Sequence, residues 1–123
     1  MADILLIEDN EASMALVRYL LSRAGHRVIV ATTGEAAVEQ ATVERPDLVL
    51  CDLQLPGMDG YAVREALLSR AVTAAIPVVA LTALSMRDDR ERVRTAGFNG
   101  YLTKPIEPES FVADVESFLA RPV

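Results

Sequence analysis

Lysine is almost absent from this sequence: of its 12 basic residues, Lys104 is the only lysine and the others are arginine. Tryptophan is missing and aromatic residues make up only 5% of the chain, so the core must be built from alanine, valine, leucine and isoleucine. The single cysteine excludes an internal disulfide and fits a reducing compartment, so we expect the protein in the cytoplasm. The one lysine matters because an ammonium is a compact point charge suited to phosphate or a carboxylate.

Long charged or apolar runs are also missing. The net charge is −6 and no run of basic residues exceeds two, which argues against nucleic acid as a direct partner. No apolar stretch reaches the ~18 residues of a membrane span, and no basic region precedes the first apolar run, so we expect neither membrane insertion nor a signal peptide. The length of 123 residues suits one domain, residues 1–123, with a core of its own.

Short apolar runs alternate with longer amphipathic stretches. The apolar runs cover residues 4–7, 28–31, 48–51, 78–81 and 100–103. Runs this short and rich in valine and isoleucine predict strands that are buried between helical layers. Strict alternation of strand and helix favours an α/β fold with a parallel sheet, helices on both faces and right-handed crossovers.

Helical segments are predicted between these strands. In the first, which ends near Gly25, the spacing places four residues toward the core: Leu16, Val17, Leu20 and Leu21. Later helices are expected over residues 36–41 and 61–69, and from a capping box at 85–88 to Gly97. Pro108 suits the first turn of a fifth helix, whose apolar stripe is Phe111, Val112, Val115, Phe118 and Leu119.

Polar residues follow the predicted strands at one edge of the sheet, where open α/β sheets bind their ligands. These residues are Glu8 with Asp9, Thr32, Asp52, Thr82 and Lys104. Three carboxylates close together repel one another, at about 4 kcal/mol for two charges ~4 Å apart at an effective dielectric of ~20. Lys104 offsets one charge, and an oxygen-only ligand set predicts Mg²⁺, or Mn²⁺, for the rest.

Two other residues of chemical interest lie outside this group. His26 precedes the second strand, away from the acidic edge, and is expected at the surface. Cys51 neighbours Asp52, but strand alternation turns its side chain to the opposite face, so we expect a buried, inert thiol.

Four motifs in this order resemble the receiver domain of response regulators, the CheY-like phosphoacceptor module of two-component signalling. They are residues 4–10 (ILLIEDN), 46–60 (PDLVLCDLQLPGMDG), 76–83 (IPVVALTA) and 97–105 (GFNGYLTKP). The resemblance covers essentially the whole chain. It implies a flavodoxin-like (βα)5 three-layer sandwich whose five-stranded parallel sheet has the order 2-1-3-4-5.

The resemblance implies a phosphoacceptor and a metal site. Asp52 matches the aspartate that receives a phosphoryl group from a phosphohistidine. Asp9, Asp52 and the backbone carbonyl of Gln54 match the Mg²⁺ ligands, and Glu8 matches an acid that reaches the metal through water. Many receivers have a second aspartate where this chain has Glu8, and the Glu-Asp-Asn variant occurs in single-domain cell-cycle regulators and in hybrid-kinase receivers.

The resemblance also implies residues that handle the phosphoryl group and report on it. Thr82 matches the hydroxyl that bonds the phosphoryl oxygens, Ala83 the small residue that leaves access, and Lys104 the paired ammonium. The Lys104–Pro105 bond matches one that is usually cis. Thr82 and Tyr101 match the family's switch pair, in which the hydroxyl moves toward the phosphoryl group and the ring turns inward.

Partners follow from the same resemblance. The phosphodonor is expected to be a histidine kinase or a histidine phosphotransfer protein. It would dock on the first helix, where Met14, Ala15 and Arg18 are expected to face outward, and on the loop at Pro105. If the chain is complete, a downstream protein target would read its output.

Three alternatives remain open. A pseudo-receiver would bind partners without accepting phosphate, but such proteins usually lose an acid or the lysine, and this chain keeps them all. A haloacid-dehalogenase-like phosphatase needs a second aspartate two positions after the nucleophile, where this chain has Gln54, so turnover chemistry is not expected. A flavodoxin-like FMN binder typically has a loop rich in serine, threonine and glycine, whereas residues 8–11 (EDNE) would repel phosphate.

Overall fold

Five strands alternate with five helices along the described part of the chain. The structure is a computed structural model that describes residues 1–83 and 87–119. The strands are β1 (Asp3–Ile7), β2 (Arg27–Ala31), β3 (Leu48–Asp52), β4 (Val78–Thr82) and β5 (Gly100–Thr103). The helices are α1 (Glu11–Arg23), α2 (Gly34–Glu44), α3 (Gly60–Leu68), α4 (Arg87–Thr95) and α5 (Pro108–Leu119).

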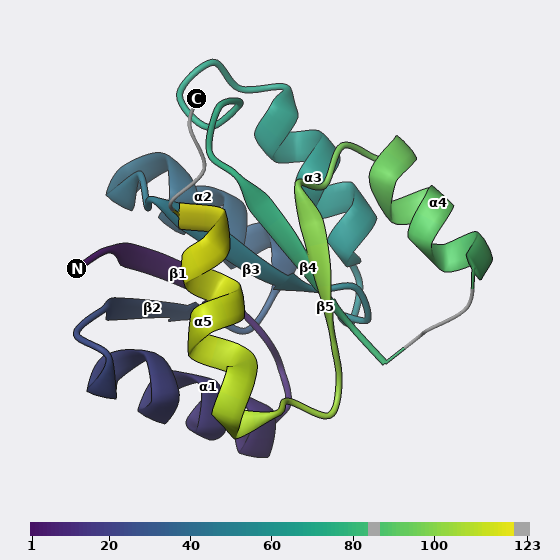
Figure 1. The fold of residues 1–123 in the computed structure, drawn as a ribbon. Coiled ribbons are helices and arrows are strands. Elements are labelled where there is room, and N and C mark those ends of the chain that lie inside the picture. The colour runs from purple at the N-terminus through teal and green to yellow at the C-terminus, as the bar shows by residue number, and fades with distance from the viewer. Residues whose placement is uncertain (84–86, 120–123) are drawn as a thin grey trace.

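The strands form one parallel sheet in the order β2-β1-β3-β4-β5, which confirms the predicted fold. Helices α1 and α5 cover one face, and α2, α3 and α4 cover the other (Figure 1). Every residue of β3 and β4 is buried, because these central strands have helices on both sides. No helix among the described residues is long and apolar enough to cross a membrane.

Two apolar clusters, one on each face of the sheet, hold these layers together. Residues of β1 and β3 contribute to both clusters by strand alternation: Leu5 and Val49 pack on the side of α2 and α3, whereas Ile4 and Leu50 pack on the side of α1 and α5. The α5 stripe is as predicted, since Phe111 and Val115 are buried and Val112, Phe118 and Leu119 pack beside them.

Side-chain caps fix where three helices begin, next to the carboxyl ends of the strands. The side chains of Asn10, Thr33 and Asp59 accept hydrogen bonds from backbone N–H groups three residues later, at 2.9, 3.2 and 2.9 Å. The Thr33 cap explains why α2 starts before the predicted residue 36. The capping box expected at 85–88 lies largely outside the described residues.

The core face of α1 differs from the prediction. Val17 and Leu21 are buried and Leu20 packs beside them, but the residue that completes this face is Met14 and not Leu16. Three residues turn a helix by about 300°, so Met14 lies near Val17 around the axis, whereas Leu16 lies about 100° away. The predicted outward position of Met14 is therefore wrong, while Ala15 and Arg18 are exposed as expected.

Candidate functional site

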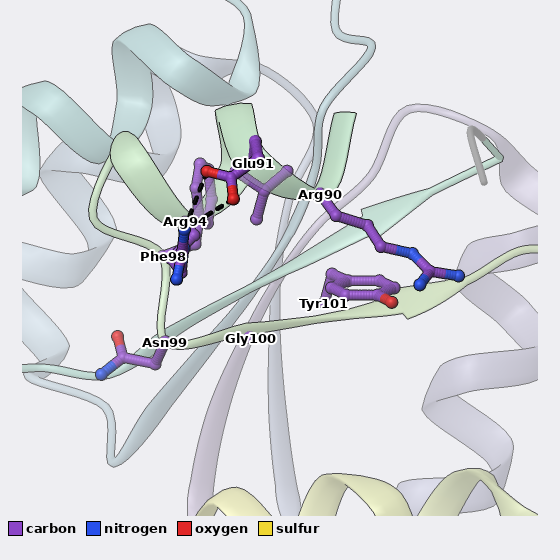
Figure 2. Close-up of a pocket in the computed structure, with 8 residues that line it drawn as sticks. Arg90, Glu91, Arg94, Phe98, Asn99, Gly100 and Tyr101 are labelled. Atoms are coloured by element: carbon purple, nitrogen blue, oxygen red, sulfur yellow. Dashed lines mark hydrogen bonds and ion pairs between the residues drawn. The ribbon is translucent and has the colours of Figure 1, made fainter. Parts of the chain in front are cut away.

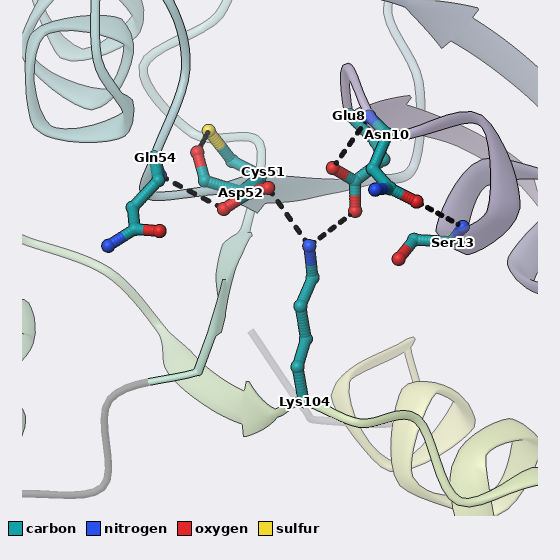
Figure 3. A network of polar contacts seen from close by, with 7 residues as sticks. All are labelled: Glu8, Asn10, Ser13, Cys51, Asp52, Gln54 and Lys104. Carbon is teal, nitrogen blue, oxygen red and sulfur yellow. Dashed lines mark hydrogen bonds and ion pairs between the residues drawn. The ribbon is translucent and has the colours of Figure 1, made fainter.

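The carboxyl ends of β1, β3 and β5 bring two acids and the only lysine together (Figure 3). The Lys104 ammonium donates to Glu8 Oε1 at 2.6 Å and to Asp52 Oδ2 at 2.9 Å. Lys104 follows β5, and its backbone N–H donates to the Thr82 carbonyl at 2.8 Å, which ties this strand end to that of β4. Glu8, Asp52 and Lys104 therefore converge as the sequence predicted.

Three carboxylates form a possible metal-binding group in this place. Glu8, Asp9 and Asp52 each bring a carboxylate oxygen within 4.8 Å of the others. Glu8 is fully buried and Asp52 nearly so, whereas Asp9 is exposed. Hard oxygen donors with an excess of negative charge fit Mg²⁺, so the residues present suit the predicted ion.

The surroundings of the site shift the pKa values of Glu8 and Lys104. Burial raises the pKa of the Glu8 carboxyl, and the neighbouring Asp52 raises it further, while Lys104 lowers it only in part. Burial alone would lower the pKa of Lys104, but its hydrogen bonds to Glu8 and Asp52 outweigh that effect and raise the pKa. The Lys104 ammonium therefore stays charged, and Glu8 is the acid whose pKa is raised.

The backbone holds the Asp52 carboxylate in a fixed orientation. Its Oδ1 accepts a hydrogen bond from the Gln54 N–H at 2.9 Å, while Oδ2 faces Lys104. The turn that follows needs a glycine at position 60, because a Cβ there would lie 2.7 Å from the Asp52 carbonyl oxygen and 2.8 Å from Leu53 Cα. The role of the Gln54 carbonyl as a metal ligand stays a prediction.

Thr82 ends β4 and Ala83 follows it, and their roles at the site stay predictions. Thr82 closes the strand and is buried, whereas Ala83 is exposed, as the access role predicted for it requires. The Lys104–Pro105 bond is cis, as expected. Thr32 is exposed after β2, an edge strand that β1 separates from β3, and so belongs to a different part of the sheet.

Tyr101 lies on β5 between the sheet and α4. Its ring is half-buried against the apolar cluster, and the Arg90 guanidinium lies 5.8 Å from the ring centroid (Figure 2). Sequence reasoning found Tyr101 but missed Arg90. Nothing in the local pattern distinguished Arg90 from the other arginines of this helix.

Cys51 and His26 have opposite outcomes. Cys51 is fully buried, and burial raises the pKa of its thiol, which confirms an inert cysteine. The predicted surface position of His26 is wrong, because the residue is only 8% exposed. Its Nδ1 accepts from the Ala2 N–H at 3.1 Å, and its Nε2 lies 2.8 Å from Glu116 Oε2, so α5 covers it.

The sequence is similar to those of many known proteins. The sequence profile described as response regulator receiver domain matches residues 4–116. The polar-differentiation response regulator DivK of Brucella anthropi is 38% identical over 116 residues, which are 94% of each chain.

Solved structures give the same result. The crystal structure of a putative response regulator from Chloroflexus aurantiacus superposes with a TM-score of 0.91 at 33% identity and covers 98% of both chains. The receiver domain of the sensor histidine kinase PA1611 from Pseudomonas aeruginosa superposes with a TM-score of 0.89 at 32% identity, again over 98% of both chains. That structure holds a magnesium ion in its active-site cleft.

Proposed function

Because this chain belongs to the family of response regulator receiver domains, the signalling modules of two-component systems, we propose that Asp52 is its phosphoryl acceptor. The observation that carries this proposal is the position of the Asp52 carboxylate, 2.9 Å from the only lysine and within 4.8 Å of oxygens from Glu8 and Asp9. Residues 1–123 then act as one receiver domain.

Mg²⁺ is the cofactor that best suits the acidic group, and Mn²⁺ would meet the same ligands. Asp9, Asp52 and the Gln54 carbonyl would hold the ion, which would offset the charge of incoming phosphoryl oxygens. Glu8 would contact it through water, the role that the family resemblance implies, while its carboxylate oxygens accept from the Lys104 ammonium and the Asn10 N–H. The magnesium ion in the Pseudomonas aeruginosa receiver domain supports this assignment.

The reaction is an in-line displacement at phosphorus. An Asp52 carboxylate oxygen forms a bond to phosphorus as the bond from phosphorus to the donor histidine breaks. The electron pair of the broken bond stays on the imidazole, which takes up a proton from water. Lys104 and the Thr82 hydroxyl then bind the phosphoryl oxygens, so that catalysis consists of positioning and charge stabilisation.

The same site supports one phosphorylation event followed by slow hydrolysis, not enzymatic turnover. A phosphatase of the haloacid dehalogenase type would need a general acid two positions after Asp52, and Gln54 cannot supply a proton in that way. A pseudo-receiver role is disfavoured because Asp52, Lys104 and both other acids are present and meet in one place.

A histidine kinase or a histidine phosphotransfer protein would supply the phosphoryl group. Ala15 and Arg18 on α1 and Pro105 after β5 are exposed beside the acidic edge, so they form the proposed docking surface. Met14 leaves this set because it packs into the core.

Phosphorylation would be reported to a downstream protein through Thr82 and Tyr101. The Thr82 hydroxyl would move toward the phosphoryl oxygens, and the half-buried Tyr101 ring would turn further inward. One charge-assisted hydrogen bond is worth about 1.5–3 kcal/mol, which is enough to bias two existing arrangements of α4 and β5. Thr82→Ala should keep phosphoryl uptake but abolish the change at Tyr101 that beryllofluoride, a phosphoryl mimic, induces in the wild type.

The test of the acceptor is phosphoryl transfer from a phosphorylated histidine phosphotransfer protein, with and without Mg²⁺. Wild-type protein should take up label only with the metal, and Asp52→Asn should take up none. Asp59→Asn is the matched control, because Asn retains the cap of α3 and should leave uptake unchanged. Uptake by Asp52→Asn at the wild-type level would refute the assignment.

A further inference from the structure

The outer edge of β5 is open for pairing with another strand. β5 is an edge strand without a charged residue, whereas the other edge, β2, begins with Arg27, which pairs with Asp3 and Glu44. Charged side chains are a usual protection of a sheet edge, and β5 lacks it. An unprotected edge of this kind offers backbone donors and acceptors to an added strand.

The hydrogen-bond pattern identifies which groups face outward. The carbonyl of Pro77, just before β4, accepts from Val49, and that of Leu81 accepts from Leu53. By alternation the Thr82 carbonyl faces β5, where it accepts from the Lys104 N–H. Residues 100, 102 and 104 therefore face β4. Tyr101 and Thr103 present their N–H and C=O groups to the outside, where the described part of the chain offers them no partner.

A pocket lies on each side of this edge, and the two differ in charge. On the α4 side, a pocket of about 400 Å³ has an apolar floor of Val93, Phe98 and Tyr101 (Figure 2). At its rim Arg94 is paired with Glu91 at 2.6 Å, whereas Arg90 has no carboxylate partner among the described residues. The guanidinium of Arg90 is thus available to an acid from outside.

On the α5 side, a second pocket of about 360 Å³ lies beside Leu102 and Thr103. Its rim carries Glu107 and Asp114, neither of which has a cation partner among the described side chains. A strand added to β5 would direct alternate side chains into these two pockets, because the side-chain period of a strand is two.

We propose that β5 binds an extended segment of a partner protein by strand addition. The segment pairs with the outward N–H and C=O groups of Tyr101 and Thr103. It carries apolar and acidic side chains toward the α4 pocket and basic side chains toward the α5 pocket. This proposal specifies how the target of the proposed function would bind. Binding itself does not depend on phosphorylation of Asp52. Only its regulation rests on the proposed function, because the switch residue Tyr101 forms part of the α4 pocket.

The experiment uses a capped nine-residue peptide in which glutamate and valine alternate on one strand face and lysine and threonine on the other. Binding is followed by NMR, and amide exchange is measured at Tyr101 and Thr103. Saturating peptide should slow exchange of both amides at least about tenfold and leave the amides of β2 unchanged. The measurement is repeated with Asp52→Asn, so that failure of the acceptor assignment cannot affect this result.

Two matched controls define the binding mode. N-methylation of one alternate set of peptide amides should abolish binding, and methylation of the other set should leave it, because only one edge of the peptide faces β5. Arg90→Gln should weaken binding about fivefold. Arg23→Gln should not, although Arg23 lies over Tyr19 in the same way, at 5.7 Å.

Protection of Tyr101 and Thr103 with a one-sided effect of methylation supports strand addition. Equal effects of both methylated sets, binding without protection of these amides, or no binding at millimolar peptide would each overturn it. A composition-matched peptide without the alternation should bind more weakly, and equal binding would contradict the assigned pocket chemistry.

Discussion

Buried polar side chains lie at both ends of the sheet, but the two ends differ in charge balance. At the amino end, Arg64 donates to the carbonyls of Gly97 and Ile76, and the Thr73 hydroxyl donates to the Leu67 carbonyl. At the carboxyl end, the acids share one ammonium. Burial of a polar group therefore does not indicate function by itself, whereas buried like charges in excess of their partners do.

A substitution of His26, at the amino end of the sheet, should have the largest effect on stability and no effect on phosphoryl uptake. His26→Ala removes two part-buried hydrogen bonds that join α5 to Ala2, just before β1, so it should lower the free energy of unfolding by about 2 kcal/mol. Phosphoryl uptake should be unchanged. Glu116→Gln retains an acceptor for His26 and should change stability much less in the same denaturation series. A loss of uptake in either variant would show that the two ends are coupled.

A substitution of Asp9 tests whether the excess of carboxylates at the carboxyl end of the sheet binds a metal ion. Asp9→Asn removes an exposed carboxylate of the metal group, so it should weaken Mg²⁺ binding at least about tenfold. Glu8→Gln should weaken it less, because its proposed contact with the ion is through water. Titration calorimetry measures both, with Asp114→Asn as an exposed control. If Glu8→Gln had the larger effect, Glu8 would be a direct ligand.

The raised pKa of Glu8 gives a smaller, pH-dependent effect in metal-free protein. The folded state binds a proton that the unfolded chain has released, so this stabilisation is present below pH 4.5 and is lost as the pH rises through the folded pKa. Glu8→Gln should flatten that decline and raise stability at pH 8 relative to the wild type. Thermal unfolding between pH 4 and 8 with chelator measures it. If Glu8→Gln lost stability with rising pH as steeply as the wild type, the pH dependence would belong to another titratable group.

Arg18 is expected to have the smallest effect, on rate alone. Arg18→Ala removes an exposed charge beside the acidic edge, so phosphoryl transfer from a histidine phosphotransfer protein should slow by a few-fold at low salt. Transfer from acetyl phosphate should not change, because that donor needs no docking surface. Arg45→Ala, at the end of α2, is the control. Equal slowing with both donors would place Arg18 in the chemistry instead of the docking.

The sequence predicted the fold well because each strand is a short apolar run that helices cover on both faces. It also predicted that acids and the lysine would meet, since parallel strands place their carboxyl ends at one edge, where Asp52 ends β3, Glu8 follows β1 and Lys104 follows β5. The alternation of strands and helices and the meeting of their polar ends depend on local pattern and topology, whereas the strand order came from the family resemblance.

The errors have a different origin. His26 is buried by partners 24 and 90 positions away, Ala2 and Glu116, and no local periodicity indicates such contacts. The predicted core face of α1 was centred on Leu16 and Val17, whereas packing against the sheet centres it on Val17 and Leu21 and brings in Met14. Arg90 and the open edge of β5 depend on how α4 and α5 flank the sheet, which is a tertiary property.

The most direct test of the central claim is to locate the phosphoryl group on the protein. Incubation with acetyl phosphate and Mg²⁺, followed by borohydride reduction and peptide mass spectrometry, converts an aspartyl phosphate into homoserine at the acceptor position. The proposed site predicts this conversion at Asp52 and at no other aspartate, and its loss when Mg²⁺ is chelated. Conversion at Asp9 or Asp59 with Asp52 intact would contradict the account.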